Sequence, residues 1–419
     1  MPITLSIPGS KSLTNRALLL AAFSEGKTVI KNSGFCDDTN YMIKGLKKLG
    51  IKIQQKGKNI TVTGNGGKFK KQKKPIKIYT GNAGTTTRFL TALATLTENE
   101  IIIDGDKRMR KRPISELVNA LNHLGAKIKS KNGYPPLYIY PKKITGGNIT
   151  LNGNISSQYL SAILMVAPLA KEKTTIKIEQ KLCSQPYANM TLKTMKQFRG
   201  KVLNKNFKQL EIKPQKYKPP KIFVVENDAS SASYPAAYIA LHPEKELNIK
   251  DLSSKSPQGD IKFIEYLKKM GCKISELEKS ILIKGPKKLK SLGTINMNEN
   301  PDLVMTFAVL SLFTDKKTRI TNIGNLRIKE TDRINALQNE LKKLGARIKT
   351  GKDWMEIFPL AAKADHNKKI SIKTYNDHRI AMAFAILKDI FPNLSIENPK
   401  CVSKSYSTFW QDLKKLRKL

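Results

Sequence analysis

The chain has 419 residues, enough for two or three domains, and its 40% of hydrophobic residues are spread evenly, as in a globular protein. The longest apolar stretch near the start, Ala17 to Phe23, is far too short to span a bilayer, so we expect neither a targeting segment nor a membrane span. The four cysteines lie far apart and the four histidines show no metal-ligand spacing. This pattern predicts reduced thiols, a cytoplasmic protein and no bound metal.

The formal net charge of +43 is extreme and raises nucleic-acid binding as one possible role. However, basic runs such as residues 68–74 read as solvated loops without a binding motif. We therefore expect small anionic substrates and no nucleic acid. A nucleic-acid-binding protein remains the remote alternative.

Arginine is rare beside lysine, so a position that stays arginine can indicate a need for its planar, bidentate guanidinium. The arginines that fall in the segments singled out below favour an anion-binding cleft, although we expect about half of them to cap helices or pair with carboxylates. They are Arg16, Arg88, Arg108, Arg110, Arg112, Arg327, Arg333 and Arg379.

The predicted elements repeat along the chain with a period of about 70 residues, longer than usual solenoid periods. Each copy reads as a helix that ends at a glycine, followed by an alternating strand, because glycine accepts the left-handed backbone that stops a helix. Six α/β units predict two domains of three units each. The copies are residues 46–53, 121–128, 267–274 and 341–348, a weaker one at 195–202, and a sixth helix at 413–416.

The first predicted helix follows Pro8-Gly9-Ser10-Lys11-Ser12 and runs through Phe23. Glycine and serine before a helix present free backbone N–H groups and the positive end of the helix dipole, which suits phosphate or carboxylate. The glycine spacing of a P-loop is absent. An ordinary capped helix is an equally good interpretation of this segment alone.

Further anion-binding candidates follow in the first half. Residues 80–88 form a second glycine-rich turn, and residues 104–113 form a basic loop before a predicted helix at 113–124. Ser156, Ser157 and Gln158 open another helix, and Ser184 begins a similar polar turn. Helix capping is the more common role of such serines.

In the second half, residues 213–220 form a proline-rich connector and one candidate domain boundary. Asp302 precedes an apolar helix and is an N-cap by default, but it could also deprotonate a hydroxyl. Residues 325–333 alternate charges before a predicted helix at 331–344, residues 375–379 place histidine and arginine before another helix, and Lys404 follows near the end.

These motifs together resemble the 5-enolpyruvylshikimate-3-phosphate (EPSP) synthase family, in its order and over nearly the whole chain. They are Pro-Gly-Ser-Lys-Ser, Gly-Asn-Ala-Gly-Thr, Ser-Ser-Gln, Asp-Ala-Ser-Ser-Ala-Ser-Tyr (Asp228 to Tyr234), Lys-Glu-Thr-Asp-Arg and Asn-Asp-His-Arg. The resemblance implies an α/β (α+β) fold of two domains, each of three inside-out units. It implies residues 9–227 in one domain, residues 1–8 and 228–419 in the other, and an active site in the cleft between them.

The resemblance also implies the substrates, with no cofactor and a monomeric enzyme. Asp302 is our choice of base, and either Glu330 or Lys11 is the acid. Shikimate 3-phosphate would be held by Lys11, Ser12, Arg16, Ser156, Ser157, Gln158, Ser184, Asp302, Asn325 and Lys329. Phosphoenolpyruvate would be held by Lys11, Gly84, Arg108, Gln158, Arg333, Arg379 and Lys404.

One departure from the family pattern and one alternative family bear on this interpretation. The family pattern has proline where Phe89 stands here, which puts the affinity for the inhibitor glyphosate in doubt. The enolpyruvyl transferase that acts on UDP-N-acetylglucosamine is the nearest enzyme alternative. That family uses a cysteine on a mobile loop, and the corresponding loop at residues 104–113 has none.

Overall fold

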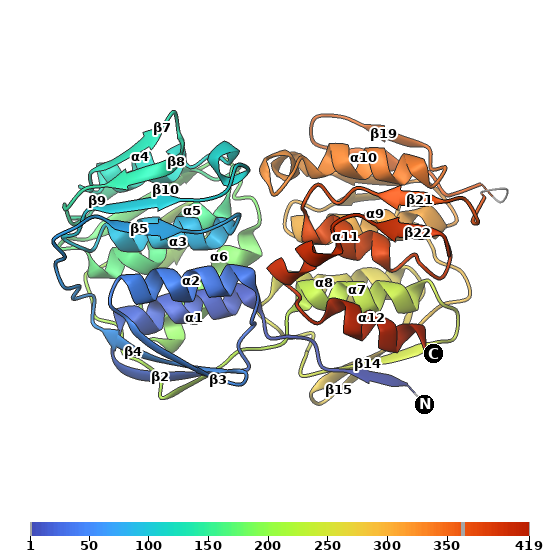
Figure 1. Ribbon diagram of the computed structural model, residues 1–419, viewed down its shortest axis with the longest axis horizontal. Helices are drawn as coiled ribbons and strands as arrows, with labels where there is room; N and C mark the ends of the chain where they lie inside the picture. Colours follow the sequence, from blue (N-terminus) through green and yellow to red (C-terminus); the bar gives the residue numbers. More distant parts are fainter. Residues whose placement is uncertain (1, 362–364, 419) are drawn as a thin grey trace. The chain divides into compact units, whose positions relative to one another are not determined.

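The computed structural model describes residues 2–361 and 365–418 and divides the chain into two compact units (Figure 1). The N unit is Gly9–Val225, and the C unit joins Met1–Pro8 to Glu226–Leu419. The proline-rich segment at 213–220 therefore lies inside the N unit, not at its edge. In the ranges described, no helix has the length and apolar character that a membrane crossing needs.

Three four-stranded sheets of one topology form the outer layers of the N unit. In each sheet a parallel pair of strands is followed by two antiparallel neighbours. Two of the sheets are each built from one continuous stretch of chain, whereas the third pairs a strand from the end of the unit, Ile222–Val224, with Glu25–Lys31 near its start. The sheets are β13 (Ile222–Val224), β2 (Glu25–Lys31), β4 (Asn59–Asn65), β3 (Lys52–Lys56); β5 (Ile76–Tyr79), β6 (Ile101–Asp104), β8 (Tyr134–Ile139), β7 (Ile128–Lys131); and β11 (Leu203–Lys205), β12 (Gln209–Ile212), β10 (Thr174–Glu179), β9 (Gly147–Asn152).

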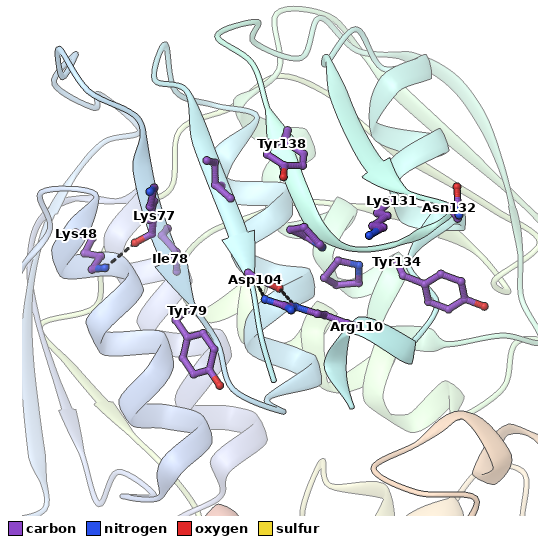
Figure 2. A pocket seen from close by; sticks show the side chains of 13 residues that line it. Lys48, Lys77, Ile78, Tyr79, Asp104, Arg110, Lys131, Asn132, Tyr134 and Tyr138 are labelled. Atoms are coloured by element: carbon purple, nitrogen blue, oxygen red, sulfur yellow. Dashed lines mark hydrogen bonds and ion pairs between the residues drawn. The ribbon is translucent and has the colours of Figure 1, made fainter. Parts of the chain in front are cut away.

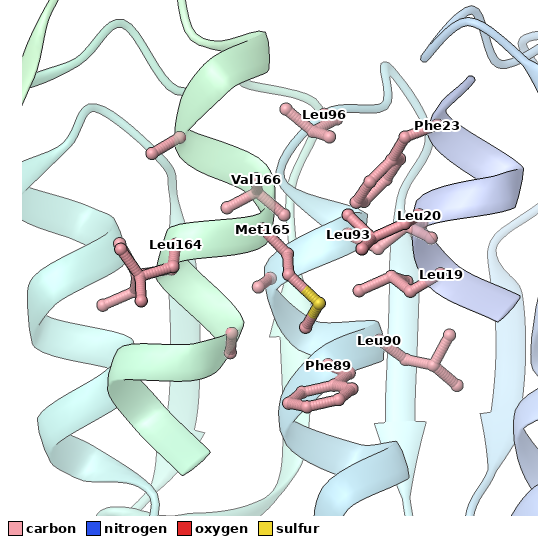
Figure 3. Packing of buried hydrophobic residues seen from close by; sticks show 14 of the residues in the cluster. Leu19, Leu20, Phe23, Phe89, Leu90, Leu93, Leu96, Leu164, Met165 and Val166 are labelled. Atoms are coloured by element: carbon pink, nitrogen blue, oxygen red, sulfur yellow. The ribbon is translucent and has the colours of Figure 1, made fainter. Parts of the chain in front are cut away.

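Helices fill the interior of the N unit. Three of them are buried on nearly every side, including polar side chains such as Arg16 and Arg88. Figure 3 shows Leu19, Phe89 and Met165, one from each, packed within the same apolar core. The central helices are α1 (Lys11–Phe23), α3 (Gly84–Ala94) and α5 (Ser157–Val166), and the amphipathic ones are α2 (Asp37–Lys48), α4 (Ser115–His123) and α6 (Gln185–Gln197).

The C unit repeats this plan. Two of its sheets have the same topology, whereas the third consists of a parallel pair alone. The sheets are β1 (Ile3–Leu5), β14 (Glu246–Lys250), β16 (Ser280–Lys284), β15 (Lys273–Leu277); β17 (Thr294–Asn296), β18 (Thr318–Thr321), β20 (Met355–Ile357), β19 (Ile348–Thr350); and β21 (Ile370–Ile372), β22 (Leu394–Ile396). The buried helices are α7 (Ala229–Ala240), α9 (Val304–Leu310) and α11 (His378–Ala385), and the others are α8 (Lys262–Lys269), α10 (Arg333–Lys343) and α12 (Phe409–Arg417).

The predicted α/β class of repeated units is confirmed, and so is the role of most repeat glycines. Gly50, Gly125, Gly271 and Gly345 all have positive φ angles, between +84° and +108°. The prediction is wrong for the weaker copy, where Arg199 takes the left-handed conformation at +62°. Gly200 serves packing there, because a Cβ atom at this position would lie 2.7 Å from the ring of Tyr217.

Candidate active site

The first turns of several N-unit helices gather at one end of that unit. Lys11 Nζ at the start of α1 lies 3.0 Å from the Asp38 carboxylate at the start of α2. Thr86 Oγ1 in the first turn of α3 donates to the Asp38 carbonyl at 2.8 Å, and Arg16 Nη2 donates to the Tyr187 carbonyl in α6 at 3.0 Å. Helix N-termini carry partial positive charge and free N–H groups, so this end of the N unit attracts anions.

Arg16 is the most deeply placed cation of this group, with only 2% of its surface exposed. Its side chain donates to neutral groups, including Thr191 Oγ1 at 2.7 Å and the Ser12 carbonyl at 2.9 Å, and it lies over the ring of Phe89. Burial lowers the pKa of Arg16 to about 10. A buried guanidinium that is held by neutral groups is prepared to accept an anion as its counter-ion.

The predicted serine and glutamine ligands also stand at helix starts. Ser156 caps α5 by accepting from the Gln158 N–H at 3.3 Å, and Ser157 beside it is buried. Ser184 precedes α6 in a left-handed conformation, with φ of +51°, and its side chain makes no capping hydrogen bond. The capping interpretation therefore holds for Ser156 and is wrong for Ser184.

The glycine-rich turn brings two arginines onto Gly84. A Cβ atom at Gly84 would lie 2.6 Å from Arg112 Nη2 and 2.7 Å from Arg88 Nη1. Arg112 Nη1 also donates to the carbonyl and to the side-chain oxygen of Asn82, both at 3.1 Å. Gly84 has no left-handed φ angle, so a side chain at this position would be opposed not by the backbone but by the ends of two arginine side chains, which would have to move.

Arg108, the predicted phosphoenolpyruvate ligand of this loop, is half-buried and precedes the 3-10 turn η1 (Met109–Lys111). Arg112 follows η1, is 3% exposed, and is the loop arginine that reaches the Gly84 turn. Sequence reasoning named Arg112 only as one of the clustered arginines. Its position directly before Pro113 was the available signal.

Two of the clustered arginines serve local structure. Arg110 forms a two-pronged pair with Asp104, with Nε–Oδ1 at 3.0 Å and Nη2–Oδ2 at 2.5 Å. Arg327 pairs with Asp332 at 2.8 Å and donates to the Lys352 carbonyl at 2.8 Å. Pairing with a carboxylate is one of the roles that we expected for about half of the eight clustered arginines.

In the C unit, Arg333 at the start of α10 is surrounded by three carboxylates and is 1% exposed. Its Nε lies 2.8 Å from Asp377, its Nη1 3.0 Å from Asp302, and its Nη2 2.9 Å from Glu330. Burial alone would lower the pKa of Arg333, but Asp377 and the other two carboxylates outweigh burial and raise it. The guanidinium is thus permanently charged and fixed in orientation.

Asp302 lies between two guanidinium groups. Its second oxygen is 2.7 Å from Arg379 Nη2. Burial would raise the pKa of Asp302, but the charges of Arg379, Arg333 and then Lys329 together hold it below its usual range. The N-cap assignment for Asp302 is wrong, because Asp302 lies within the turn η4 (Pro301–Leu303), Leu303 directly precedes α9, and the Asp302 side chain binds arginines.

Glu330 and Asn325 complete this cluster. The Glu330 carboxylate contacts Arg333 on one oxygen and lies 3.8 Å from Lys404 Nζ on the other. Asn325 lies in the turn η6 (Gly324–Ile328), and within the described ranges neither polar atom of its buried amide has a hydrogen-bond partner. Such an amide is available to a ligand.

Asp377 is a residue that the sequence named only within a motif. It is fully buried, binds Arg333 through both oxygens, and accepts from the backbone N–H of Arg379 as the N-cap of α11. One carboxylate therefore orients both predicted phosphoenolpyruvate arginines of the C unit. An aspartate directly before an apolar helix was the signal for the cap, but not for the ion pair.

The buried arginine clusters of the two units suit a protein that acts on anionic substrates. The family model of EPSP synthase (3-phosphoshikimate 1-carboxyvinyltransferase) matches residues 3–413. A 3-phosphoshikimate 1-carboxyvinyltransferase of Buchnera aphidicola subsp. Cinara cedri is 45% identical, covering 97% of this chain and 93% of that protein. One of Colwellia psychrerythraea is 42% identical, covering 97% and 95%.

Solved structures agree on the fold. An EPSP synthase of Acinetobacter baumannii superposes with a TM-score of 0.79 at 22% identity, covering 99% of this chain and 95% of that one. The chain belongs to the EPSP synthase family. Membership confirms the predictions of an enolpyruvyl transferase and of the shikimate pathway.

Proposed function

We propose that this chain binds shikimate 3-phosphate and phosphoenolpyruvate and uses Asp302 as the base. The enolpyruvyl group moves to the 5-hydroxyl of shikimate 3-phosphate and phosphate is released, as in the family to which the chain belongs. The shikimate 3-phosphate set is Lys11, Ser12, Arg16, Ser156, Ser157, Gln158, Ser184, Asp302, Asn325 and Lys329. The phosphoenolpyruvate set is Lys11, Gly84, Arg108, Gln158, Arg333, Arg379 and Lys404.

The observation that carries the proposal is the position of Asp302 between Arg333 and Arg379. Two guanidinium groups can bind the carboxylate and phosphate of phosphoenolpyruvate in a bidentate manner. When these anions approach, they compete with Asp302 for the same donors. The pKa of the Asp302 carboxylate then rises towards its usual value, which makes it a better base for the 5-hydroxyl proton.

A second proton must reach the methylene carbon of phosphoenolpyruvate, so that the neighbouring carbon can accept the hydroxyl oxygen. Glu330, between Arg333 and Lys404, and Lys11, paired with Asp38, are the two candidates. The tetrahedral intermediate then loses phosphate as the new methyl group gives up a proton. Every step is a proton or group transfer between the two substrates and these side chains.

We add Arg112 to the phosphoenolpyruvate set because its guanidinium group lies against Gly84. We further propose that the enzyme acts in the cytoplasm as a monomer and that the reaction itself involves no nucleic acid.

A phosphate-release assay with both substrates tests the proposal, because phosphate should appear only when both are present. Asp302→Asn keeps the size of the side chain but cannot take the proton, so we expect kcat to fall by roughly 100-fold or more. Arg417→Met, which removes an exposed ion pair to Asp389 between two residues outside the proposed sets, is the matched control and should retain kcat. Turnover of UDP-N-acetylglucosamine in place of shikimate 3-phosphate, or unchanged kcat in Asp302→Asn, would contradict the proposal.

A further inference from the structure

The outer face of the sheet β5-β6-β8-β7 carries a groove of about 890 Å³ that the proposed reaction does not use. Figure 2 shows the side chains that line the groove, contributed by the strands, by the end of α2 and by the connections that follow β6 and β7. Lys77 on β5, Ile102 on β6 and Tyr138 on β8 stand in one row across the sheet. None of the groove's lining residues belongs to either proposed substrate set.

Three tyrosine rings are exposed on this face. Tyr79 is 52% exposed, Tyr134 37% and Tyr138 38%. Elsewhere in the described chain, the large apolar side chains that stand exposed are all aliphatic, such as Leu203 on β11 and Leu277 on β15. Five sheets share one topology, so the fold itself does not require exposed rings on this one.

These rings also differ from other aromatic rings of the chain in their neighbours. Beside the sheet β17-β18-β20-β19, Arg319 covers the ring of Trp354 at 4.2 Å and Arg347 covers that of Phe358 at 3.7 Å. No lysine or arginine within the described ranges covers Tyr79, Tyr134 or Tyr138 in this way, and Tyr79 meets Tyr41 edge to face. Flat rings without such a cover can stack on another planar group.

The groove is positively charged. Lys48, Lys77, Lys131 and Arg110 line it, and its one lining carboxylate, Asp104, is bound by Arg110. The chain as a whole carries a net charge of +43. A long anion that also offers planar groups matches both properties of this face.

We propose that this sheet face binds single-stranded RNA, with bases stacked on the tyrosine rings and phosphates next to the lysines. Exposed aromatic side chains on a sheet are a sequence-tolerant platform for unpaired bases, and surrounding cations follow the phosphate backbone. Bases within a duplex are already stacked and paired, so a duplex cannot use the rings. The basic runs contain no binding motif in sequence; this platform exists only because the sheet brings three separate tyrosines together.

The test is fluorescence anisotropy of a labelled single-stranded 12-nucleotide RNA of mixed sequence with the full chain. Tyr79→Ala with Tyr138→Ala should weaken binding roughly 10-fold or more, and the corresponding double phenylalanine variant should restore it, because the ring is what stacks. Both tyrosines are exposed, so phosphate release and the circular dichroism spectrum should stay unchanged. Leu203→Ala with Leu277→Ala is the matched control for loss of exposed apolar side chains.

A second control separates the face from overall charge. Lys70→Glu with Lys73→Glu reverses two exposed cations outside the groove and should cost less affinity than the tyrosine variant. Weaker binding of the corresponding RNA duplex would also support the proposal. Equal affinity for duplex and single strand, unchanged binding by the tyrosine variant, or an equal loss in the lysine control would overturn it.

Discussion

Two buried arginines, one in each unit, differ in how the protein offsets the free-energy cost of burying their charge. Arg16 is 2% exposed and donates to hydroxyl and carbonyl groups, and burial lowers its pKa to about 10. Arg333 is 1% exposed and is bound by Asp302, Glu330 and Asp377, which raise its pKa. The first charge is not neutralised by a carboxylate within the described structure, whereas the second is more than neutralised.

The partners of each arginine determine how its cluster would respond to a bound anion. An uncompensated guanidinium at the helix starts of the N unit gains a counter-ion when a phosphate binds, so charge favours binding there. A guanidinium already paired with carboxylates must exchange partners, so binding in the C unit changes the basicity of those carboxylates. The N-unit cluster thus suits affinity, and the C-unit cluster suits proton transfer.

Arg333→Met should give the largest loss of stability. Removal of the cation leaves three carboxylates together in a buried place, and breaking such buried pairs typically costs about 3–5 kcal/mol. Urea unfolding followed by circular dichroism measures this loss. Arg417→Met, which breaks an exposed pair in the same unit, should cost less than about 1 kcal/mol. Similar losses in the two variants would show that the carboxylates around Arg333 are not strained by its absence.

Arg16→Met should affect substrate binding more than stability. No carboxylate is left behind, so the loss of stability should be smaller than for Arg333→Met. The Michaelis constant for shikimate 3-phosphate should rise roughly 10- to 100-fold, since a charge-assisted hydrogen bond contributes about 1.5–3 kcal/mol. Steady-state kinetics and urea unfolding of the two variants side by side check the contrast, and equal destabilisation would break it.

Gly84→Ala should act through its arginine neighbours. A methyl group at this position must displace Arg112 and Arg88, which corresponds to about 1–3 kcal/mol for overpacking and should raise the Michaelis constant for phosphoenolpyruvate. In a double-mutant cycle with Arg112→Lys, the two effects should be less than additive, because the shorter lysine removes one of the two close contacts with the methyl group. Additive effects would mean that Gly84 contacts the substrate independently of Arg112.

The smallest effect concerns acid stability. Because the pKa of Asp302 is lowered in the folded chain, its carboxylate stabilises the fold above its unfolded pKa of about 4, and this contribution is lost as the pH falls towards the folded value. Asp302→Asn should therefore flatten the decline in melting temperature below pH 4. The flattening should persist in high salt because the pair is largely buried.

Glu211 is the comparison for that experiment. Its hydrogen bonds with Lys173 and Lys205 lower its pKa to about 2. Both lysines are about half exposed, so in Glu211→Gln any flattening should disappear in high salt. The same salt dependence in both variants would show that Asp302 behaves as a surface carboxylate.

Many of the helices could be predicted from the sequence because each depends on residues that are close along the chain. The helix predicted at 331–344 is Arg333–Lys343, and the one predicted at 113–124 is Ser115–His123. Apolar spacing and terminal glycines specify such helices locally. The errors came where packing competes with the local signal, as at Gly200, where a tyrosine ring needs the space, and at Asp302, where two arginines occupy the presumed capping group.

The sequence by itself determined the repeat and the family, because periodicity and motif residues are properties of the chain alone. Only the tertiary structure decided which partner each charge has. Asp377 meets Arg333 across 44 positions and Arg112 meets Gly84 across 28, distances at which sequence spacing says nothing about contact. The three tyrosines of the basic sheet face likewise become one surface only when β5 and β8 join the same sheet, because pairing across strands is set by the packing of the whole unit.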